Sequence, residues 1–174
     1  MTNVVDVVVT YLELRAPASR SVRTTDPAAG SFTLQQQQAP MAAPLAFALY
    51  LRVGGPWHWT DRLRWTEVDW HAAIHRDDVE LWIARMDDEI AGYFELHVEG
   101  AAVELKYFGL LPEFTGRGLG GPLLSSAIER AWALGKDRLT VNTCTLDHPA
   151  ALSNYLKHGF TVLRTESRRQ ELAT

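Results

Sequence analysis

The sequence is poor in cysteine, in long apolar runs and in clustered basic residues, and each shortage excludes a class of protein. Cys144 is the one cysteine, so the chain can form no internal disulfide and no cysteine cage for a metal. No apolar run reaches the roughly 18 residues of a membrane span, and the amino terminus lacks a basic segment followed by an apolar one. We therefore expect a cytoplasmic protein with no membrane partner.

Basic residues do not gather into a surface that would bind nucleic acid. The formal net charge is -4, from 17 basic and 21 acidic residues, and no block of lysine and arginine stands out. The histidines are scattered without the spacing of metal ligands. We expect no nucleic-acid partner and no metal, and an anionic cofactor would need local hydrogen-bond donors.

The chain does contain enough apolar residues for one core. It has 174 residues, of which 47% are hydrophobic, and this is near the usual size of one domain. We find no internal repeat and no dividing linker, so residues 1–174 are predicted to form a single domain. The sequence leaves the choice between monomer and homodimer open.

Hydrophobic periodicity and turn residues predict a mixed fold. The predicted strands are Val4–Leu14, Phe32–Gln38, Glu80–Met86, Ile90–Val98, Ala102–Leu110, Arg138–Thr145 and Phe160–Arg164. The predicted helices are Pro44–Val53, one capped by Thr66 that runs to about Arg76, one that follows Gly121 and ends at Gly135, and Pro149–His158. Residues 16–30 are predicted to be a loop. This order indicates an α/β (α+β) fold, antiparallel first and with crossover helices later.

A glycine-rich turn between a strand and a helix is the most informative local pattern. Its sequence is Thr115-Gly116-Arg117-Gly118-Leu119-Gly120-Gly121. Glycines let phosphate oxygens approach the backbone amides, and the first N–H groups of the next helix favour an anion. Arg117 can add a charge-assisted contact. No Lys-Ser/Thr pair follows the glycines, and the preceding strands do not form a βαβ unit, so neither a triphosphatase loop nor a dinucleotide fold is expected. We predict a diphosphate site, with a plain helix cap as the alternative.

This turn resembles the acetyl-CoA-binding motif of the GNAT superfamily of N-acetyltransferases, Gln/Arg-x-x-Gly-x-Gly/Ala after a strand and a proline. Thr115 departs from the pattern at the first position. The segment Asp147–Phe160 resembles the Asn-x-x-Ala-x-x-Leu/Phe-Tyr-x-x-x-Gly-Phe helix and strand of the same family. The matching residues there are Ala151, Tyr155, Gly159 and Phe160, and His148 stands where Asn is common. The resemblance implies a mixed, mostly antiparallel central sheet with a splay between its two middle strands, flanked by about four helices.

The resemblance also implies the cofactor, acetyl-CoA (coenzyme A). The backbone from Phe108 to Leu110 would bind the pantetheine arm as though it were another strand, and an N–H near Leu110 would stabilise the oxyanion. The implied cofactor-binding residues are Phe108, Gly109, Leu110, Thr115, Gly116, Arg117, Gly118, Leu119, Gly120, Gly121, Asn142, His148 and Lys157.

Two residues are expected to move protons. Tyr155 matches the proton donor of the family, and an aromatic side chain packed on the core is the alternative. Glu104 is the leading candidate for the base, because its apolar neighbours would desolvate it and raise its pKa; a glutamate facing solvent is equally open. Glu95, Asp147 and His148 are weaker candidates, and Asp147 is expected to cap the next helix. Cys144 is expected to be buried and inert.

The acceptor is expected to bind to an aromatic loop between the first two helices. The predicted substrate-binding residues are Trp57, His58, Trp59, Asp61 and Arg62, with Trp65 and Trp70 continuing the wall. Rings and an Asp/Arg pair suit a small amine or a carboxylate, and an aromatic core under a loop is the alternative. We expect transfer of an acetyl group to a primary amine of a small molecule by direct attack in a ternary complex. A non-catalytic acyl-CoA sensor, an enzyme acting on protein or peptide amines, and a structural dimer domain are the alternatives.

Overall fold

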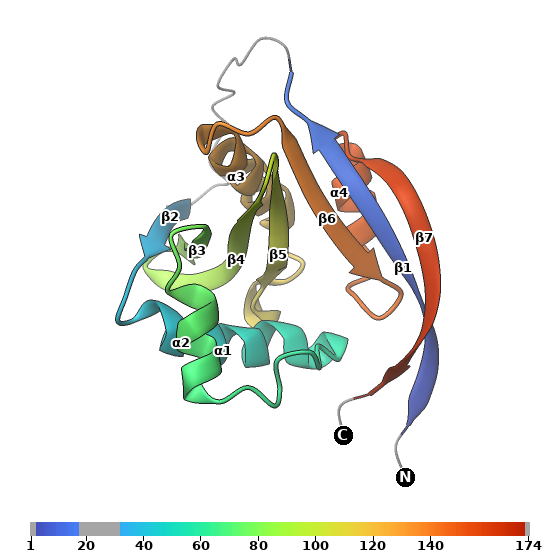
Figure 1. Ribbon diagram of the computed structural model, residues 1–174, viewed down its shortest axis with the longest axis horizontal. Helices are drawn as coiled ribbons and strands as arrows, with labels where there is room; N and C mark the ends of the chain where they lie inside the picture. The colour runs from blue at the N-terminus through green and yellow to red at the C-terminus, as the bar shows by residue number, and fades with distance from the viewer. Residues whose placement is uncertain (1–2, 18–31, 173–174) are drawn as a thin grey trace.

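A computed structural model describes residues 3–17 and 32–172, and within these ranges the chain forms one seven-stranded sheet with helices on both faces (Figure 1). The strands are β1 (Val4–Arg15), β2 (Phe32–Gln37), β3 (Val79–Met86), β4 (Glu89–Glu99), β5 (Ala102–Leu110), β6 (Arg138–Cys144) and β7 (Thr161–Glu171). The helices are α1 (Ala42–Gly54), α2 (Glu67–Ile74), α3 (Gly120–Ala133) and α4 (Ala151–Lys157), with 3-10 turns η1 (Gly55–Trp57) and η2 (Pro112–Phe114). The predicted mixed fold is confirmed. The predicted loop falls largely on residues 18–30, outside the described residues.

Local signals place the helix ends close to where the sequence predicts them. The Thr66 hydroxyl accepts a hydrogen bond from the Asp69 amide, and the Asp69 carboxylate accepts one from the Thr66 amide, which makes a capping box at the start of α2. Gly135 and Gly159 have φ angles of 76° and 91° and follow α3 and α4. Helix α4 begins at Ala151, two residues later than predicted.

Two hydrophobic cores lie on opposite faces of the sheet, because the pleat sends successive side chains of each strand to different sides. On β4, Tyr93 belongs to the core under α1 and α2, whereas its neighbour Phe94 belongs to the core under α3 and α4. Both side chains are fully buried. The sheet therefore carries a helical layer on each side, and a ligand that passes between two strands would reach both layers.

The sheet is mostly antiparallel and opens between β5 and β6, which is its parallel pair. These strands pair only through Val103 with Leu139 and Glu104 with Thr140. Beyond Glu104, the edge of β5 that faces β6 has no strand partner among the described residues. The predicted splay is thus present, and it leaves backbone groups of β5 available to a ligand.

A bulge in β5 sits next to this splay. The register against β4 shifts between Lys106 and Gly109, and Tyr107 has a φ of 51°. The two residues of the bulge point to opposite faces: Tyr107 packs on Tyr50 beneath α1, and Phe108 packs on Tyr155 of α4. The bulge therefore sends one aromatic ring to each side of the opening.

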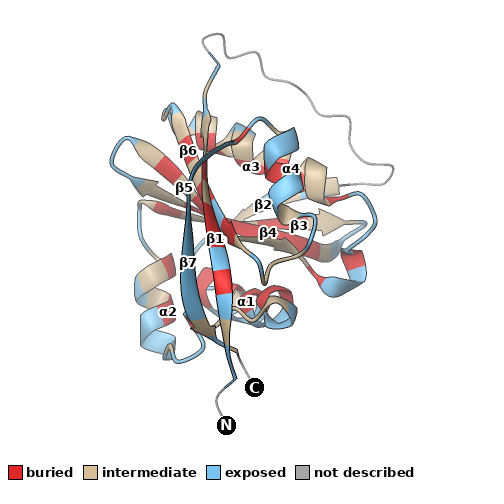
Figure 2. Ribbon diagram, turned by 90° about the vertical axis from the view of Figure 1, so that its right-hand side faces the viewer, coloured by how far each residue is buried: buried red, intermediate tan, exposed pale blue. Residues whose placement is uncertain are grey.

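Strand β7 is longer than predicted. It was expected to end at Arg164, but it runs to Glu171 and pairs along its length with β1, which lies between β6 and β7 (Figure 2). Ten of its eleven residues are exposed, Gln170 being the exception. Because the backbone ladder with β1 holds this strand, its side chains need no apolar alternation, and the sequence therefore carried little strand signal there.

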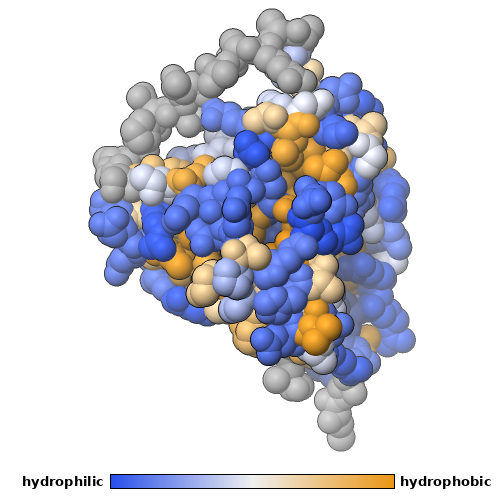
Figure 3. Space-filling model, turned by 60° about the vertical axis from the view of Figure 1, so that its left-hand side comes forward, coloured by the Kyte–Doolittle hydropathy of each residue, from blue (hydrophilic) through white to orange (hydrophobic). Residues whose placement is uncertain are grey.

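None of the helices in the described ranges combines the length and the apolar character that a membrane span requires. From the side shown in Figure 3 the surface is largely hydrophilic, with smaller hydrophobic patches between charged and polar groups.

Candidate active site

A cleft of about 710 Å³ occupies the opening between β5 and β6. Its walls are the second half of β5, the glycine turn, β6, α4 and the segment that follows η1. These segments are far apart in the sequence, and the fold brings them together around the gap between β5 and β6. The predicted site residues that line the cleft are Trp57, His58, Trp59, Asp61, Glu104, Phe108, Gly109, Leu110, Thr115, Gly116, Gly118, Leu119, Gly120, Gly121, Asn142, His148, Tyr155 and Lys157. The predicted site residues outside this lining are Arg62 and Arg117, together with the weaker candidates Trp65, Trp70 and Glu95.

The glycine turn has the backbone of an anion cradle. Gly116 and Gly118 have φ angles of 77° and 76°, in the left-handed region that side chains rarely adopt. A Cβ atom added at either position would meet nothing within 4 Å, so the space in front of the backbone is open. The amides of both residues donate no hydrogen bond within the described parts of the chain. Helix α3 begins at Gly120 and adds its first N–H groups, so the turn fits a diphosphate.

Arg117 lies outside the lining of the cleft. It is exposed, and its guanidinium carbon lies 4.9 Å from the centroid of the Phe114 ring. We expected a charged contact to phosphate from this side chain. In the structure the turn offers backbone donors, and the cation of Arg117 stacks on the aromatic ring of η2.

Tyr155 combines a packed ring with a position on the cleft. Its side chain is 5% exposed and packs between Phe108 and Phe160, with ring centroids 6.1 and 5.6 Å away. Burial, helped by the negative charge of Asp147, raises the pKa of the Tyr155 hydroxyl well above its ordinary value. The hydroxyl is protonated at neutral pH and can serve as a donor.

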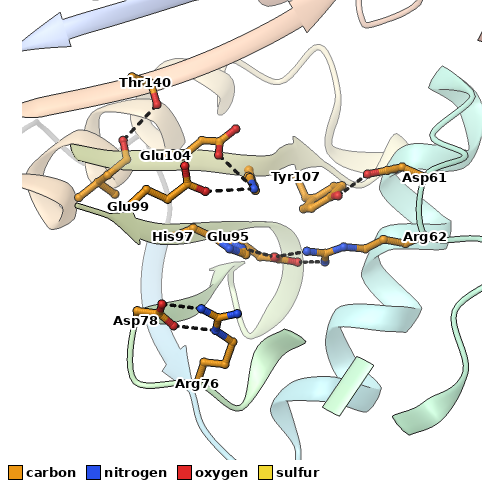
Figure 4. A network of polar contacts seen from close by, with 12 residues as sticks. Asp61, Arg62, Arg76, Asp78, Glu95, His97, Glu99, Glu104, Tyr107 and Thr140 are labelled. Carbon is orange, nitrogen blue, oxygen red and sulfur yellow. Dashed lines mark hydrogen bonds and ion pairs between the residues drawn. The ribbon is translucent and has the colours of Figure 1, made fainter. Parts of the chain in front are cut away.

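Glu104 lies at the point where β5 leaves β6. Its carboxylate is 3.0 Å from the Lys106 ammonium, which is also 3.5 Å from Glu99 (Figure 4). Burial raises the pKa of Glu104 above its ordinary value, and Lys106 opposes this shift. The direction agrees with the expected desolvation, and a raised pKa makes a carboxylate a stronger base.

The aromatic loop forms a wall of the cleft and contacts both β5 and the segment after β6. Trp59 packs on Tyr107 at 5.5 Å between ring centroids, and Trp57 packs edge-on against His148 at 5.2 Å. The Gln170 side chain donates a hydrogen bond of 3.1 Å to the His58 carbonyl, which ties the loop to β7. The loop is thus held on both sides of the opening.

Arg62 turns away from the cleft, contrary to our expectation. Its guanidinium donates two hydrogen bonds, of 2.7 and 3.0 Å, to the carboxylate of Glu95, and both side chains are buried (Figure 4). It also stacks on Tyr107, 3.9 Å from the ring centroid, and on Trp65, at 4.4 Å. A buried guanidinium needs such a partner, and Glu95 supplies it from β4. Arg62 therefore supports the loop from behind, and Glu95 is committed to this pair.

Two further expectations need correction. Asp147 does not cap α4: its carboxylate accepts hydrogen bonds from the Thr143 hydroxyl, the Cys144 amide and the Trp59 indole, and so joins the end of β6 to the loop. Trp65 and Trp70 lie in the core with Arg62 and outside the cleft lining, so they do not continue the acceptor wall.

Several lining residues were not predicted. They include Lys106, Tyr107, Cys144, Asn154, Arg168 and Gln170. Tyr107 comes directly before Phe108, where the predicted cofactor-binding segment begins, so its position in the sequence could have identified it as a lining residue. Arg168 and Gln170 follow the predicted end of β7 and had no such signal, because only the pairing with β1 brings them to the opening.

Comparison with known proteins agrees with this geometry. A model of the Acetyltransferase (GNAT) family matches residues 45–160, which hold most of α1, the β5 splay, the glycine turn and α4. No curated protein matches the chain. Solved structures that resemble it share its fold at low sequence identity.

Three of these structures show how far the sequence identity and the coverage vary. A GNAT family acetyltransferase from Elizabethkingia anophelis with acetyl-CoA bound is 23% identical, with a TM-score of 0.57, over 76% of this chain and 78% of that one. The ribosomal-protein-S18-alanine N-acetyltransferase from Escherichia coli is 15% identical, with a TM-score of 0.61, over 83% of this chain and 96% of that one. An aminoglycoside acetyltransferase from an uncultured soil metagenomic sample is 11% identical, with a TM-score of 0.61, over 74% of this chain and 87% of that one. Against other matched structures, the chain spans 64%, 51% and 58% of their length.

Proposed function

Because the chain belongs to the Acetyltransferase (GNAT) family, we propose that it moves the acetyl group of acetyl-CoA to a primary amine. The observation that carries the proposal is the continuity of one cleft. It joins the glycine cradle, the unpaired edge of β5 and Tyr155 to an aromatic loop on the opposite face of the sheet. A cofactor bound through the sheet would have its diphosphate at one end and its thioester beside the loop.

Different residues of this chain bind the diphosphate end and the thioester end of the cofactor. The amides of Gly116 and Gly118 and the start of α3 hold the diphosphate, and the edge of β5 holds the pantetheine arm by backbone hydrogen bonds. Acetyl-CoA supplies an activated acyl thioester. An N–H near Leu110 stabilises the negative charge that develops on the carbonyl oxygen.

Proton transfer completes the reaction. The amine nitrogen attacks the thioester carbonyl, the carbon–sulfur bond breaks, and the departing sulfur takes a proton from the Tyr155 hydroxyl. Glu104 accepts the proton that the amine loses, directly or through water. The raised pKa of Glu104 makes its carboxylate a stronger base, and Tyr155 carries a proton at neutral pH.

Direct attack in a ternary complex is favoured over a covalent route through Cys144. This thiol lines the cleft, but burial and the charge of Asp147 raise its pKa, and a protonated thiol is a poor nucleophile. We therefore expect Cys144→Ala to keep turnover, with intersecting initial-rate lines when amine and cofactor are varied. Parallel lines, and loss of turnover in the variant, would support an acyl-cysteine instead.

We propose a small molecule as the acceptor. The loop that forms the acceptor wall is fixed to β7 through Gln170 and to β6 through Asp147, so this end of the cleft is bounded on two sides. The aminoglycoside and ribosomal-protein enzymes named above show that the same fold occurs with either kind of acceptor.

The experiment is release of free thiol from acetyl-CoA in a screen of small amines and peptides. Turnover of small amines that is lost in Gly118→Val is the expected result. Binding of CoA without release of thiol from any amine would support a sensor, and turnover of peptides alone would overturn the small-molecule proposal.

A further inference from the structure

We propose that the acceptor carries a second positive charge besides its reacting amine, and that Asp61 binds this charge. The inference rests on the proposed acetyl transfer and adds the chemical class of the acceptor. The sequence suggested that the neighbouring Asp61 and Arg62 act as a pair. In the structure Asp61 lines the cleft, whereas Arg62 points to the buried Glu95.

Asp61 presents an unneutralised carboxylate to the cleft. It lines the cleft and is exposed, and no ion pair reaches it within the described parts of the chain. Arg62, the adjacent cation, is buried against Glu95. Lys106, another cation of the lining, is held by Glu99 and Glu104. The acceptor end of the cleft therefore has a negative charge that no cation of the described residues pairs.

Two tyrosines fix the orientation of this carboxylate. The Tyr50 hydroxyl donates a hydrogen bond of 2.7 Å to Oδ1 of Asp61, and the Tyr107 hydroxyl donates one to Oδ2. Burial raises the pKa of both tyrosines well above the ordinary value, so both remain donors at any working pH. Each oxygen accepts one of these hydrogen bonds and keeps capacity for another donor. The anion is thus oriented before a ligand arrives.

The rings around Asp61 suit a cation. Tyr50, Trp59 and Tyr107 pack together with centroids 5.4 to 5.6 Å apart, and Trp59 and Tyr107 line the cleft. Aromatic faces beside a carboxylate attract ammonium and guanidinium groups. The guanidinium of the adjacent Arg62 is occupied by Glu95 and is therefore not offered to a carboxylate ligand.

The position of Asp61 allows one molecule to reach both the anion and the thioester. Its partner Tyr107 comes directly before Phe108–Leu110, the segment proposed to bind the pantetheine arm. The bulge turns Tyr107 toward the acceptor face while the backbone continues along the cleft. A second cation on Asp61 would therefore hold the acceptor with its other amine directed at the splay.

Arg168 is the competing anchor. It lines the cleft from β7, in register with Val7 of β1, and no ion pair reaches it within residues 3–17 and 32–172. It would favour an acceptor with a carboxylate. We prefer Asp61 because two tyrosine hydroxyls hold it in place, whereas no hydrogen bond of the described structure fixes the Arg168 side chain.

The test compares acceptors that differ only in the remote group. We would measure kcat/KM for linear α,ω-diamines, for monoamines of the same chain length and for the matching ω-amino acids, at constant saturating acetyl-CoA. Diamines should be preferred, and Asp61→Asn should reduce the diamine-to-monoamine ratio of kcat/KM about 10- to 100-fold, the range for losing a hydrogen bond to a charged group. Asp77→Asn removes an exposed carboxylate outside the cleft and is the matched control.

Each outcome has a distinct meaning. Preference for the ω-amino acids, or equal use of diamines and monoamines by the unaltered protein, would overturn the inference and leave acetyl transfer intact. An unchanged ratio in Asp61→Asn would overturn it as well. Release of no thiol from any amine, with CoA still bound, would instead be the failure of the proposed function. The preference of the unaltered protein needs no variant, so the test does not depend on how Asp61→Asn folds.

Discussion

The buried pair of Arg62 and Glu95 supports the sharpest prediction on stability. Glu95 has no exposed surface and Arg62 is 3% exposed, and the Glu95 carboxylate also contacts His97 Nε2 at 2.8 Å. Glu95→Gln keeps the shape but removes the negative charge and places an amide donor against the guanidinium. The variant would leave a buried cation without its anion, which costs about 3–5 kcal/mol. For a chain of this size, that loss corresponds to a fall in Tm of about 6–20 °C.

The assay is urea denaturation with linear extrapolation, supported by thermal melting. The chain offers a matched control in Arg76 and Asp78, which also form two hydrogen bonds, of 2.8 and 2.6 Å, but with side chains 56% and 43% exposed. Asp78→Asn should shift the midpoint little, because water screens an exposed pair.

A double variant separates the cost of an unpaired charge from the value of the pair. Arg62→Met with Glu95→Leu removes both charges and should recover most of the stability lost in Glu95→Gln. A free energy of unfolding for Glu95→Gln within about 1 kcal/mol of the parent would refute the reasoning, since stability of a domain totals only about 5–15 kcal/mol.

The remaining predictions concern the cleft. Gly118→Val should abolish CoA binding in calorimetry by crowding the cradle, whereas Gly135→Val, at the same φ of 76° but outside the cleft, should cost stability and keep CoA affinity. Tyr155→Phe should lower kcat about 10²-fold, and unchanged turnover would remove Tyr155 from the reaction. Glu104 must lose its proton to act, so activity should rise with pH through a pKa above the ordinary value of 4.5, and Glu104→Gln should abolish that limb of the profile.

Features of the site that depend on neighbouring residues could be predicted from the sequence. The glycine turn was predicted because positive φ angles at Gly116 and Gly118 and a following helix are properties of a few adjacent residues. The capping box at Thr66 was predictable for the same reason. Tyr155 and Glu104 were both placed on the cleft, although their roles as proton carriers stay predictions.

Errors arose where a distant partner decides the outcome. The orientation of Arg62 depends on Glu95, 33 residues away on another strand. Asp147 was expected to cap a helix, but the Thr143 hydroxyl and Trp59 indole that it accepts from are brought to it by β6 and by the loop. Short-range patterns contain no information about such partners.

The sequence by itself determined the order of the strands and helices, the backbone of the glycine turn and the residue types available to the site, because these depend on local propensity and periodicity. The tertiary structure decided that β1 lies between β6 and β7 and that β7 runs on to bring Arg168 to the cleft. It also decided that Asp61 faces the cleft while Arg62 does not. The physical reason is that a buried charge must find an opposite charge, and only the folded chain settles which one is within reach.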